Sequence, residues 1–414
     1  MHRLKLALLI RATIALVLAL VAAQAHAQTL TTIASFTGAE GSKPEGSLTL
    51  SADGSTFYGM TETGGANNDG AIFSIPVAGG SPTILASLDG ADGANPWGSL
   101  TLSADGTTLY GMSYGGGAKN EGAIFSIAVT GGAPTVLASL STSAGFDAYG
   151  SLTLSADGST LYGMTQNGGP YNTGVVFSIP ATGGALTTLS SFSFSPTAPQ
   201  QPQGSLDLIG NTLYGLTADG GADKTGAVFS ISAAGGPITT LGSFTDNYPS
   251  WPDGNLTLVG STFYGLARLG GANDDGVIFS MPMSGGPITY LASFDGANGA
   301  YPFGSLTLVG STLYGMTQSG GAYGDGVIFS IPVTGGTPTT LISFDGTNGE
   351  APQRNDLTLV GSNLYGMTPS GGAYGDGTIF VLSTPEPSSV VLLGLGVLGL
   401  GAMALRGRLR RQPA

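Results

Sequence analysis

The sequence predicts an all-β fold, a seven-bladed β-propeller of four-stranded blades, and three observations support this. First, a Tyr-Gly-Met or Tyr-Gly-Leu triplet recurs at spacings of 52, 52, 52, 50, 50 and 51 residues, beginning at Tyr58, Tyr110, Tyr162, Tyr214, Tyr264, Tyr314 and Tyr365. Second, each repeat carries four short β-like runs separated by glycine-rich turns. Third, the last repeat lacks its fourth run, and an unmatched copy of that run, residues 30–36, opens the chain that remains after the predicted signal peptide.

The unmatched run favours a closed ring. An open β-solenoid, the alternative, would have a spare strand at one end and a missing strand at the other, with unpaired backbone groups at both. In a propeller, the N-terminal strand completes the blade that the C-terminal strands begin. We therefore expect residues 30–36 to pair beside Ile379.

Each repeat has the same order of elements. The runs are Gly-Ser-Leu-Thr-Leu, Leu/Phe-Tyr-Gly-Met-Thr, Ile-Phe-Ser-Ile-Pro and Thr-Xaa-Leu-Ala-Ser-Phe. Their apolar residues are expected to pack neighbouring sheets together. We expect the Tyr58 hydroxyl to bond across blades and Gly59 to let another backbone come close. Because the triplet recurs at a core position, it indicates packing rather than binding.

The composition limits the chemistry. The chain has 71 glycines, 9% charged residues, no cysteine and two histidines, His2 and His26. We divide it into a signal peptide (1–27), the propeller (28–383) and a sorting tail (384–414). The mature propeller then has neither imidazole nor thiol, which excludes Ser-His-Asp and Cys-His catalysis, His-ligated zinc, His- or Cys-ligated haem and disulfides.

The N-terminal segment has the pattern of a secretory signal peptide. Arg3, Lys5 and Arg11 precede and flank an apolar run over residues 12–23, and Ala25-His26-Ala27 follows. Small residues at this spacing predict cleavage between Ala27 and Gln28. A retained membrane anchor is the alternative.

The C-terminal segment has a sorting pattern. Pro385-Glu386-Pro387 precedes an apolar run at 390–405 that predicts a short transmembrane helix, and an arginine cluster that favours a cytoplasmic end follows it. This combination resembles the PEP-CTERM sorting signal of bacterial exported proteins. The resemblance implies recognition by an exosortase-type enzyme, cleavage of the tail, transient anchoring in the inner membrane, and delivery to the cell surface or extracellular matrix.

The repeats are similar to the GloVer-type tandem repeat. The similarity lies in the Tyr-Gly-Met core, the Gly-Gly-Ala-Xaa-Xaa-Asp-Gly loop and the Val-Ile-Phe-Ser run, and it spans residues 30–382. The family implies an architecture but no settled activity. Thr173 and Thr225 replace the loop acid in two repeats, so no role of that acid can require all seven blades.

One face of the disc is expected to carry the variable chemistry. Strands alternate in direction, so the loops between second and third strands share a face with the connections between blades. This face is expected to contain twenty acidic and five basic residues, which gives it a net charge of −15. Such a surface would repel nucleic acid.

Aromatic residues in these loops are candidates for ligand contact. Aromatic rings pack against the apolar faces of sugars, and nearby carboxylates accept bonds from their hydroxyls. The alternative is that the rings plug gaps between blades, above all those just before a blade begins, or that they are simply solvent-exposed. The ligand-face candidates are Trp97, Tyr149, Tyr171, Trp251, Tyr301, Phe303, Tyr323 and Tyr374.

No cofactor is expected, although calcium would suit the oxygen-rich loops. The commoner reason for Asp before Gly is a tight turn in which the carboxylate bonds its own backbone. The candidate calcium ligands are Asp69, Asp89, Asp92, Asp275, Asp325 and Asp376.

These features predict a non-catalytic exported protein that binds or scaffolds extracellular polysaccharide or another envelope component. One alternative is a polysaccharide lyase or glycosidase that uses carboxylates and tyrosine, with its site on the irregular connections at 141–149 and 193–203. Another is a purely structural exoprotein.

Overall fold

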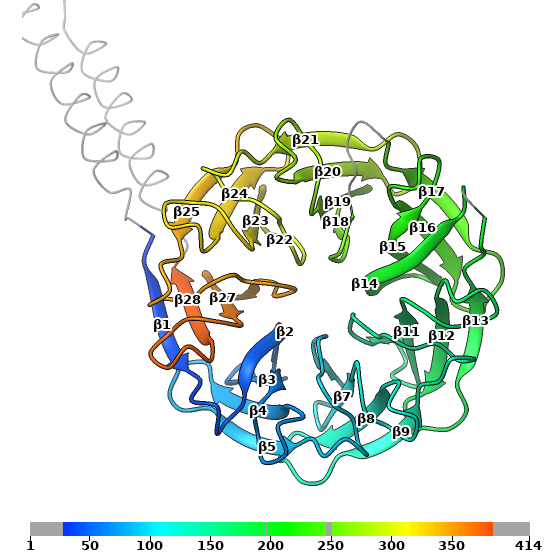
Figure 1. The fold of residues 1–414 in the computed structure, drawn as a ribbon, viewed down its shortest axis with the longest axis horizontal. Coiled ribbons are helices and arrows are strands. Elements are labelled where there is room, and N and C mark those ends of the chain that lie inside the picture. Colours follow the sequence, from blue (N-terminus) through cyan, green and yellow to red (C-terminus); the bar gives the residue numbers. More distant parts are fainter. Residues whose placement is uncertain (1–27, 196, 246–250, 384–414) are drawn as a thin grey trace, which may run out of the picture. The chain divides into compact units, whose positions relative to one another are not determined.

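Seven four-stranded antiparallel sheets surround a central axis in a computed structural model that describes residues 28–195, 197–245 and 251–383 (Figure 1). The propeller is the unit formed by Leu30–Val360 and Leu364–Val381. The predicted fold class is therefore confirmed. The signal peptide through Ala27, the sorting residues Pro385, Glu386 and Pro387, and the 390–405 segment lie outside the described residues. Within the described ranges, no helix is long and apolar enough to span a membrane.

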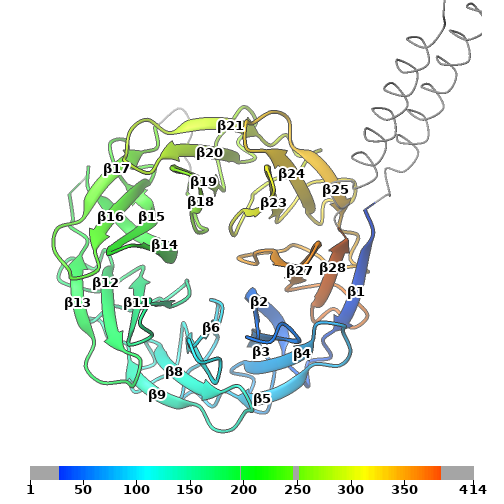
Figure 2. The same ribbon diagram turned by 180° about the vertical axis from the view of Figure 1, so that it is seen from behind.

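Each blade uses its strands in the same order from the axis outward (Figure 2). The innermost strands are β2 (Ser42–Leu50), β6 (Thr101–Leu102), β10 (Thr153–Leu154), β14 (Pro199–Ile209), β18 (Thr257–Val259), β22 (Thr307–Val309) and β26 (Thr358–Val360). The second strands are β3 (Thr56–Thr63), β7 (Thr108–Met112), β11 (Thr160–Thr165), β15 (Thr212–Gly220), β19 (Thr262–Ala267), β23 (Thr312–Thr317) and β27 (Asn363–Thr368).

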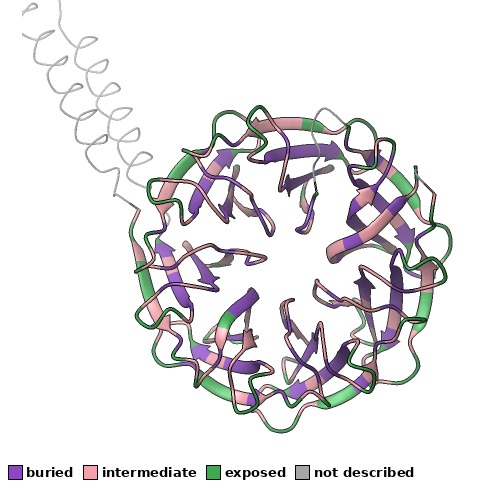
Figure 3. Cartoon of the chain, viewed as in Figure 1, coloured by how far each residue is buried: buried purple, intermediate pink, exposed green. Residues whose placement is uncertain are grey.

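The third strands follow the Ile-Phe-Ser run and the fourth strands form the rim. The third strands are β4 (Ala71–Pro76), β8 (Ala123–Ala128), β12 (Val175–Pro180), β16 (Ala227–Ser232), β20 (Val277–Pro282), β24 (Val327–Pro332) and β28 (Thr378–Ser383). The fourth strands are β5 (Thr83–Ser87), β9 (Thr135–Ser139), β13 (Thr187–Ser191), β17 (Thr239–Ser243), β21 (Thr289–Ser293), β25 (Thr339–Ser343) and β1 (Leu30–Ser35). Figure 3 shows that the third strands are largely buried while the rim is partly exposed.

The N-terminal strand closes the ring as predicted. The last sheet has the order β1-β28-β27-β26, so β1 is its rim strand. Just beyond β1, the Phe36 backbone N–H donates to the Gly377 carbonyl at 3.0 Å, and the Lys43 N–H donates to the Asp376 carbonyl at 3.0 Å. Strands from both ends of the chain thus form one blade.

The hydrophobic core lies between neighbouring blades. Tyr58 and Met60 of the first blade form one cluster with Leu109 and Phe125 of the second. Phe36 belongs to the equivalent cluster, which joins the last blade to the first. The predicted bond of the triplet tyrosine across blades is present at Tyr264, whose hydroxyl donates to the Val333 carbonyl at 3.2 Å.

The triplet glycine has a different role from the one expected. A Cβ on Gly59 would lie 2.4 Å from the ring of Phe73, which is fully buried on the neighbouring strand β4. Gly59 therefore makes room for an aromatic side chain rather than for another backbone. The same arrangement recurs at Gly163 with Phe177.

Candidate functional site

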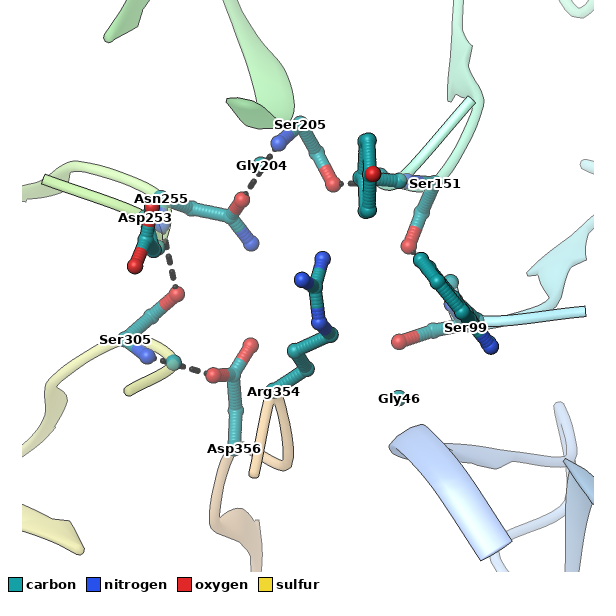
Figure 4. Close-up of a pocket in the computed structure, with 16 residues that line it drawn as sticks. Gly46, Ser99, Ser151, Gly204, Ser205, Asp253, Asn255, Ser305, Arg354 and Asp356 are labelled. Carbon is teal, nitrogen blue, oxygen red and sulfur yellow. Dashed lines mark hydrogen bonds between the residues drawn. The ribbon is translucent and has the colours of Figure 1, made fainter. Parts of the chain in front are cut away.

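Seven residues that begin the blades form a closed circle of hydrogen bonds around the axis, and Figure 4 shows the part of it between Ser151 and Asp356. In each blade the backbone N–H of this residue donates to the side-chain oxygen of its counterpart in the next blade, at 2.5–3.0 Å. The last bond, from Asp356 N–H to Ser47 Oγ, joins the seventh blade to the first. We call this circle the axial ring; its members are Ser47, Ser99, Ser151, Ser205, Asn255, Ser305 and Asp356.

The glycine that precedes a member of the axial ring allows neighbouring blades to approach each other closely. A Cβ on Gly150 would lie 1.7 Å from the carbonyl oxygen of Gly204, and one on Gly254 would lie 1.7 Å from that of Gly304. In the seventh blade Asn355 takes the glycine position, and its amide donates to the Gly46 carbonyl at 2.8 Å. Glycine at this position in the first six blades therefore lets the backbones approach one another at the axis.

Several donors of the axial ring have no acceptor within the described chain. The hydroxyls of Ser99, Ser151 and Ser205 accept backbone bonds, but none donates to a described group. The Asn255 side chain also accepts through its oxygen and leaves its NH2 group without an acceptor among the described residues. The free volume among the lining residues is about 30 Å³, which holds one or two water molecules.

Arg354 lies at the centre of this circle. Its side chain enters the space enclosed by the axial ring, as Figure 4 shows. The guanidinium carbon lies 4.4 Å from the ring centre of Tyr149, 5.0 Å from that of Trp97 and 5.8 Å from that of Phe303. Within the described residues, the guanidinium donates no hydrogen bond and forms no ion pair.

The aromatic rings around Arg354 support one another. Trp97 stacks on Tyr114 with ring centres 4.3 Å apart, and it lies 4.9 Å from Tyr149. Burial, together with the neighbouring Tyr114 and Asp147, raises the pKa of Tyr149 to about 12, so this hydroxyl stays protonated at neutral pH. We call Trp97, Tyr149, Asp253, Phe303 and Arg354, together with the axial ring, the axial site.

Two buried carboxyl groups occupy positions equivalent to these aromatic residues. Asp253 and Glu45 each precede the ring glycine of their blade and are less than 10% exposed. Burial raises the pKa of Asp253 to about 6, against the opposing charges of Arg354 and Arg268. Burial raises the pKa of Glu45 to about 8, and one of its carboxyl oxygens has no hydrogen-bond partner in the described structure.

Replacing Glu45 by glutamine should stabilise the protein at alkaline pH. Burial raises the pKa of Glu45 from 4.5 to about 8 in the folded protein, although Arg354 and Lys43 favour ionisation and Glu62 opposes it. The wild type therefore loses stability as pH rises from 4.5 through 8, where the unfolded chain ionises more readily than the folded one.

We expect E45Q and wild type to unfold at similar denaturant concentrations at pH 4. At pH 9 the variant should be more stable by about 2–4 kcal/mol. Chemical denaturation at both pH values measures the difference between the two proteins. An equal difference at pH 4 and pH 9 would show that Glu45 is not held protonated in the fold.

The structure separates the predicted aromatic residues into two groups. Trp97, Tyr149 and Phe303 converge on Arg354, and Trp97 and Tyr149 line the space at the axis, whereas Phe303 is buried. Tyr301 is half-buried. Trp251 lies two positions before Asp253, which is the residue that precedes the glycine of this blade, so Trp251 is equivalent to Tyr301. The exposed members are Tyr171, Trp251, Tyr323 and Tyr374, with exposed fractions of 50–67%.

Asp89 and Asp92 share one connection between blades, whereas each of the other candidate calcium ligands lies in a loop of its own. Within the described ranges no three Asp, Glu, His or Cys side chains come together as a metal site. Asp89 Oδ1 accepts bonds from the N–H groups of Ala91 and Asp92, and Asp92 Oδ1 accepts from Asp89 N–H. The carbonyls of the repeated loop acids accept bonds from the next connection in chain order: Asp69 from Asn95, Asp275 from Tyr301, Asp325 from Ala351, and Asp376 from Lys43.

Sequence reasoning did not single out Arg354, Tyr114 or the two buried acids. A signal for Arg354 was present, because the last triplet spacing is 51 rather than 50 residues. Two residues, Gln353 and Arg354, lie between Pro352 and Asn355, where the other blades have one residue, and Arg354 has a positive φ of 51°. No comparable signal marks Asp253, which is one of many loop acids until the fold buries it.

Solved structures with the same fold include two lyases. Oligogalacturonate lyase from Vibrio parahaemolyticus is 12% identical, with 88% of this chain and 95% of that chain covered and a TM-score of 0.57. An oligogalacturonate lyase in complex with manganese is 13% identical, with 88% and 97% covered and a TM-score of 0.55. At these identities the likeness shows the fold alone. No curated protein matches the chain.

Two family patterns match the sequence and confirm both resemblances. The Gloeobacter/Verrucomicrobia repeat matches residues 19–206 and 156–380. The PEP-CTERM protein-sorting motif matches residues 383–411, which indicates an exported protein sorted by an exosortase. The chain therefore belongs to the Gloeobacter/Verrucomicrobia repeat family and carries a PEP-CTERM sorting motif.

Proposed function

We propose that this protein is a non-catalytic exported propeller that binds extracellular polysaccharide, or another sugar-bearing envelope component, through the axial site. The observation that carries the proposal is the convergence of Trp97, Tyr149 and Phe303 around one guanidinium at the centre of the propeller. Aromatic faces pack against the apolar faces of sugars, and polar donors beside them bind hydroxyl oxygens.

The sorting motif is consistent with this role. An exosortase-sorted protein reaches the cell surface or the extracellular matrix, where polysaccharide is an abundant partner. Before processing, the C-terminal segment at 390–405 would hold the chain in the inner membrane. The rigid ring would then present one constant site on a scaffold with few charged residues.

A glycan array with the purified protein tests the proposal, with calcium present and absent. We expect at least one class of polysaccharide to bind, and the Trp97→Ala variant to lose most of that binding. The matched control is Tyr323→Ala, because Tyr323 is 67% exposed in a loop between second and third strands. If no glycan binds in either condition, or if both variants lose binding equally, the proposal is wrong.

A polysaccharide-active enzyme is the second candidate. Asp253 and Glu45 have raised pKa values beside the axial site, and carboxyl groups perturbed in this way often act as general acids. Incubation with polysaccharides, followed by detection of new reducing ends, tests this candidate. Turnover that disappears in Asp253→Asn would favour the enzyme, whereas binding without turnover favours the non-catalytic role.

A further inference from the structure

We propose that the axial site binds the carboxylate of an acidic sugar, with Arg354 as the anchoring group. The inference rests on the proposed function and narrows it from polysaccharide in general to polymers that bear uronic acids. It depends on three properties of the site, which are its surplus of donors, its small free volume and its local charge.

The axial site contains hydrogen-bond donors that have no acceptor among the described residues. Arg354 donates to no described acceptor, and neither do the hydroxyls of Ser99, Ser151 and Ser205 or the amide of Asn255. Five groups from five blades thus offer N–H or O–H donors to one space on the axis. A space lined by unmatched donors suits an anion, because oxyanions accept several hydrogen bonds at once.

The free volume selects a small, flat group. About 30 Å³ is free among the lining residues, which is too little for a sugar ring but is similar to the volume of one or two waters. A carboxylate would enter by displacing such waters and could accept two parallel bonds from the planar guanidinium. The sugar ring itself would stay outside, beside Trp97 and Tyr149, which are both half-buried.

The local charge permits an anion despite the acidic composition of the chain. Arg354 and Arg268 are the cations at the centre, with Arg268 over Phe303 at 4.7 Å. Glu45, which also interacts with Lys43 and Glu62, is largely neutral at pH 7 because burial raises its pKa to about 8. Asp356 is half-buried in the axial ring, and desolvation of its carboxyl raises its pKa.

Asp253 is the group that competes with an incoming anion. Burial raises its pKa to about 6, so it is mostly ionised at pH 7.5, where it attracts Arg354 and Arg268. Removing this charge should leave the guanidinium more available. Asp253→Asn is therefore expected to bind the acidic sugar several-fold more tightly at pH 7.5, a gain that a misfolded variant could not produce.

Isothermal titration calorimetry with a galacturonic acid trisaccharide tests the inference, beside the galactose trisaccharide and its sulfated form. The titrations use 0.15 M salt, where the screening length of about 8 Å limits repulsion from the acidic loops. We expect the galacturonate to bind at least tenfold more tightly than the neutral sugar. Arg354→Gln should abolish this preference, and Lys119→Gln should keep it, because Lys119 is an exposed residue of a loop on the same face.

The outcomes separate this inference from the proposed function. Equal binding of acidic and neutral sugars that is unchanged in Arg354→Gln would overturn the inference and leave the proposed function standing. Binding of the sulfated sugar alone would overturn the carboxylate assignment. If no saccharide binds here or on the glycan array, both claims fail.

Discussion

Replacing Gly150 by alanine should open the propeller at its axis. The added Cβ would lie 1.7 Å from the Gly204 carbonyl oxygen, an atom of the backbone of the next blade. No side-chain rotation relieves this contact, so the third and fourth blades must separate and weaken the bond from Ser151 N–H to Ser205 Oγ at 2.8 Å. We expect a loss of roughly 3 kcal/mol in unfolding free energy, the upper part of the range for overpacking.

Gly115→Ala is the matched control for Gly150→Ala. Its Cβ would have nearest neighbours at 3.6 Å, an ordinary van der Waals contact. Chemical denaturation of both variants should therefore separate them clearly, with Gly115→Ala close to wild type. Similar midpoints for the two variants would show that the blades do not approach as closely as described.

Truncating Phe36 to alanine should weaken the closure of the ring. Phe36 is fully buried, and its ring packs edge-on against Phe73 with centres 5.1 Å apart. It belongs to the cluster that joins the last blade to the first. Removing a buried phenylalanine side chain costs about 3–5 kcal/mol, and here the loss falls where the two ends of the chain meet.

The control for Phe36→Ala is Phe194→Ala. Phe194 is 77% exposed, so its truncation removes little buried area. We expect limited proteolysis to release the N-terminal strand β1 in Phe36→Ala but not in Phe194→Ala. Intact β1 in both variants, with unchanged thermal midpoints, would contradict the assigned role of Phe36 in closure.

The sequence predicted the closed propeller because closure changes the order of the runs at the two ends of the repeat region. The run at 30–36 is a fourth-strand run that precedes the first complete repeat, and the repeat that ends at Leu382 has no fourth-strand run of its own. The packing of the triplet was predicted for the same reason, since a residue that recurs in every blade must satisfy the same neighbours each time. The prediction for Gly59 was wrong, because a repeated glycine does not indicate whether an aromatic side chain or another backbone lies next to it.

The axial site was harder to predict because its residues differ between blades. At the position before the glycine of each blade, or before Asn355 in the seventh, the side chains are Glu45, Trp97, Tyr149, Gln203, Asp253, Phe303 and Arg354. The sequence placed Trp97, Tyr149 and Phe303 before a blade, but it could not show that one arginine lies among them. That contact joins residues up to 257 positions apart, Trp97 and Arg354, and it depends on the finished circle.

The most direct test of ring closure is a disulfide between Thr29, which directly precedes strand β1, and Ser383, the last residue of strand β28. Thr29 Oγ1 and Ser383 Oγ lie 3.1 Å apart, although 354 positions separate the residues. The chain contains no cysteine, so Thr29→Cys with Ser383→Cys introduces the only two thiols, and sulfur atoms at these places are near bonding distance. We expect mild oxidation to remove both free thiols and to yield an intramolecular crosslink that migrates faster on a non-reducing gel. Two thiols that remain free, or that pair only between molecules, would contradict the closed ring.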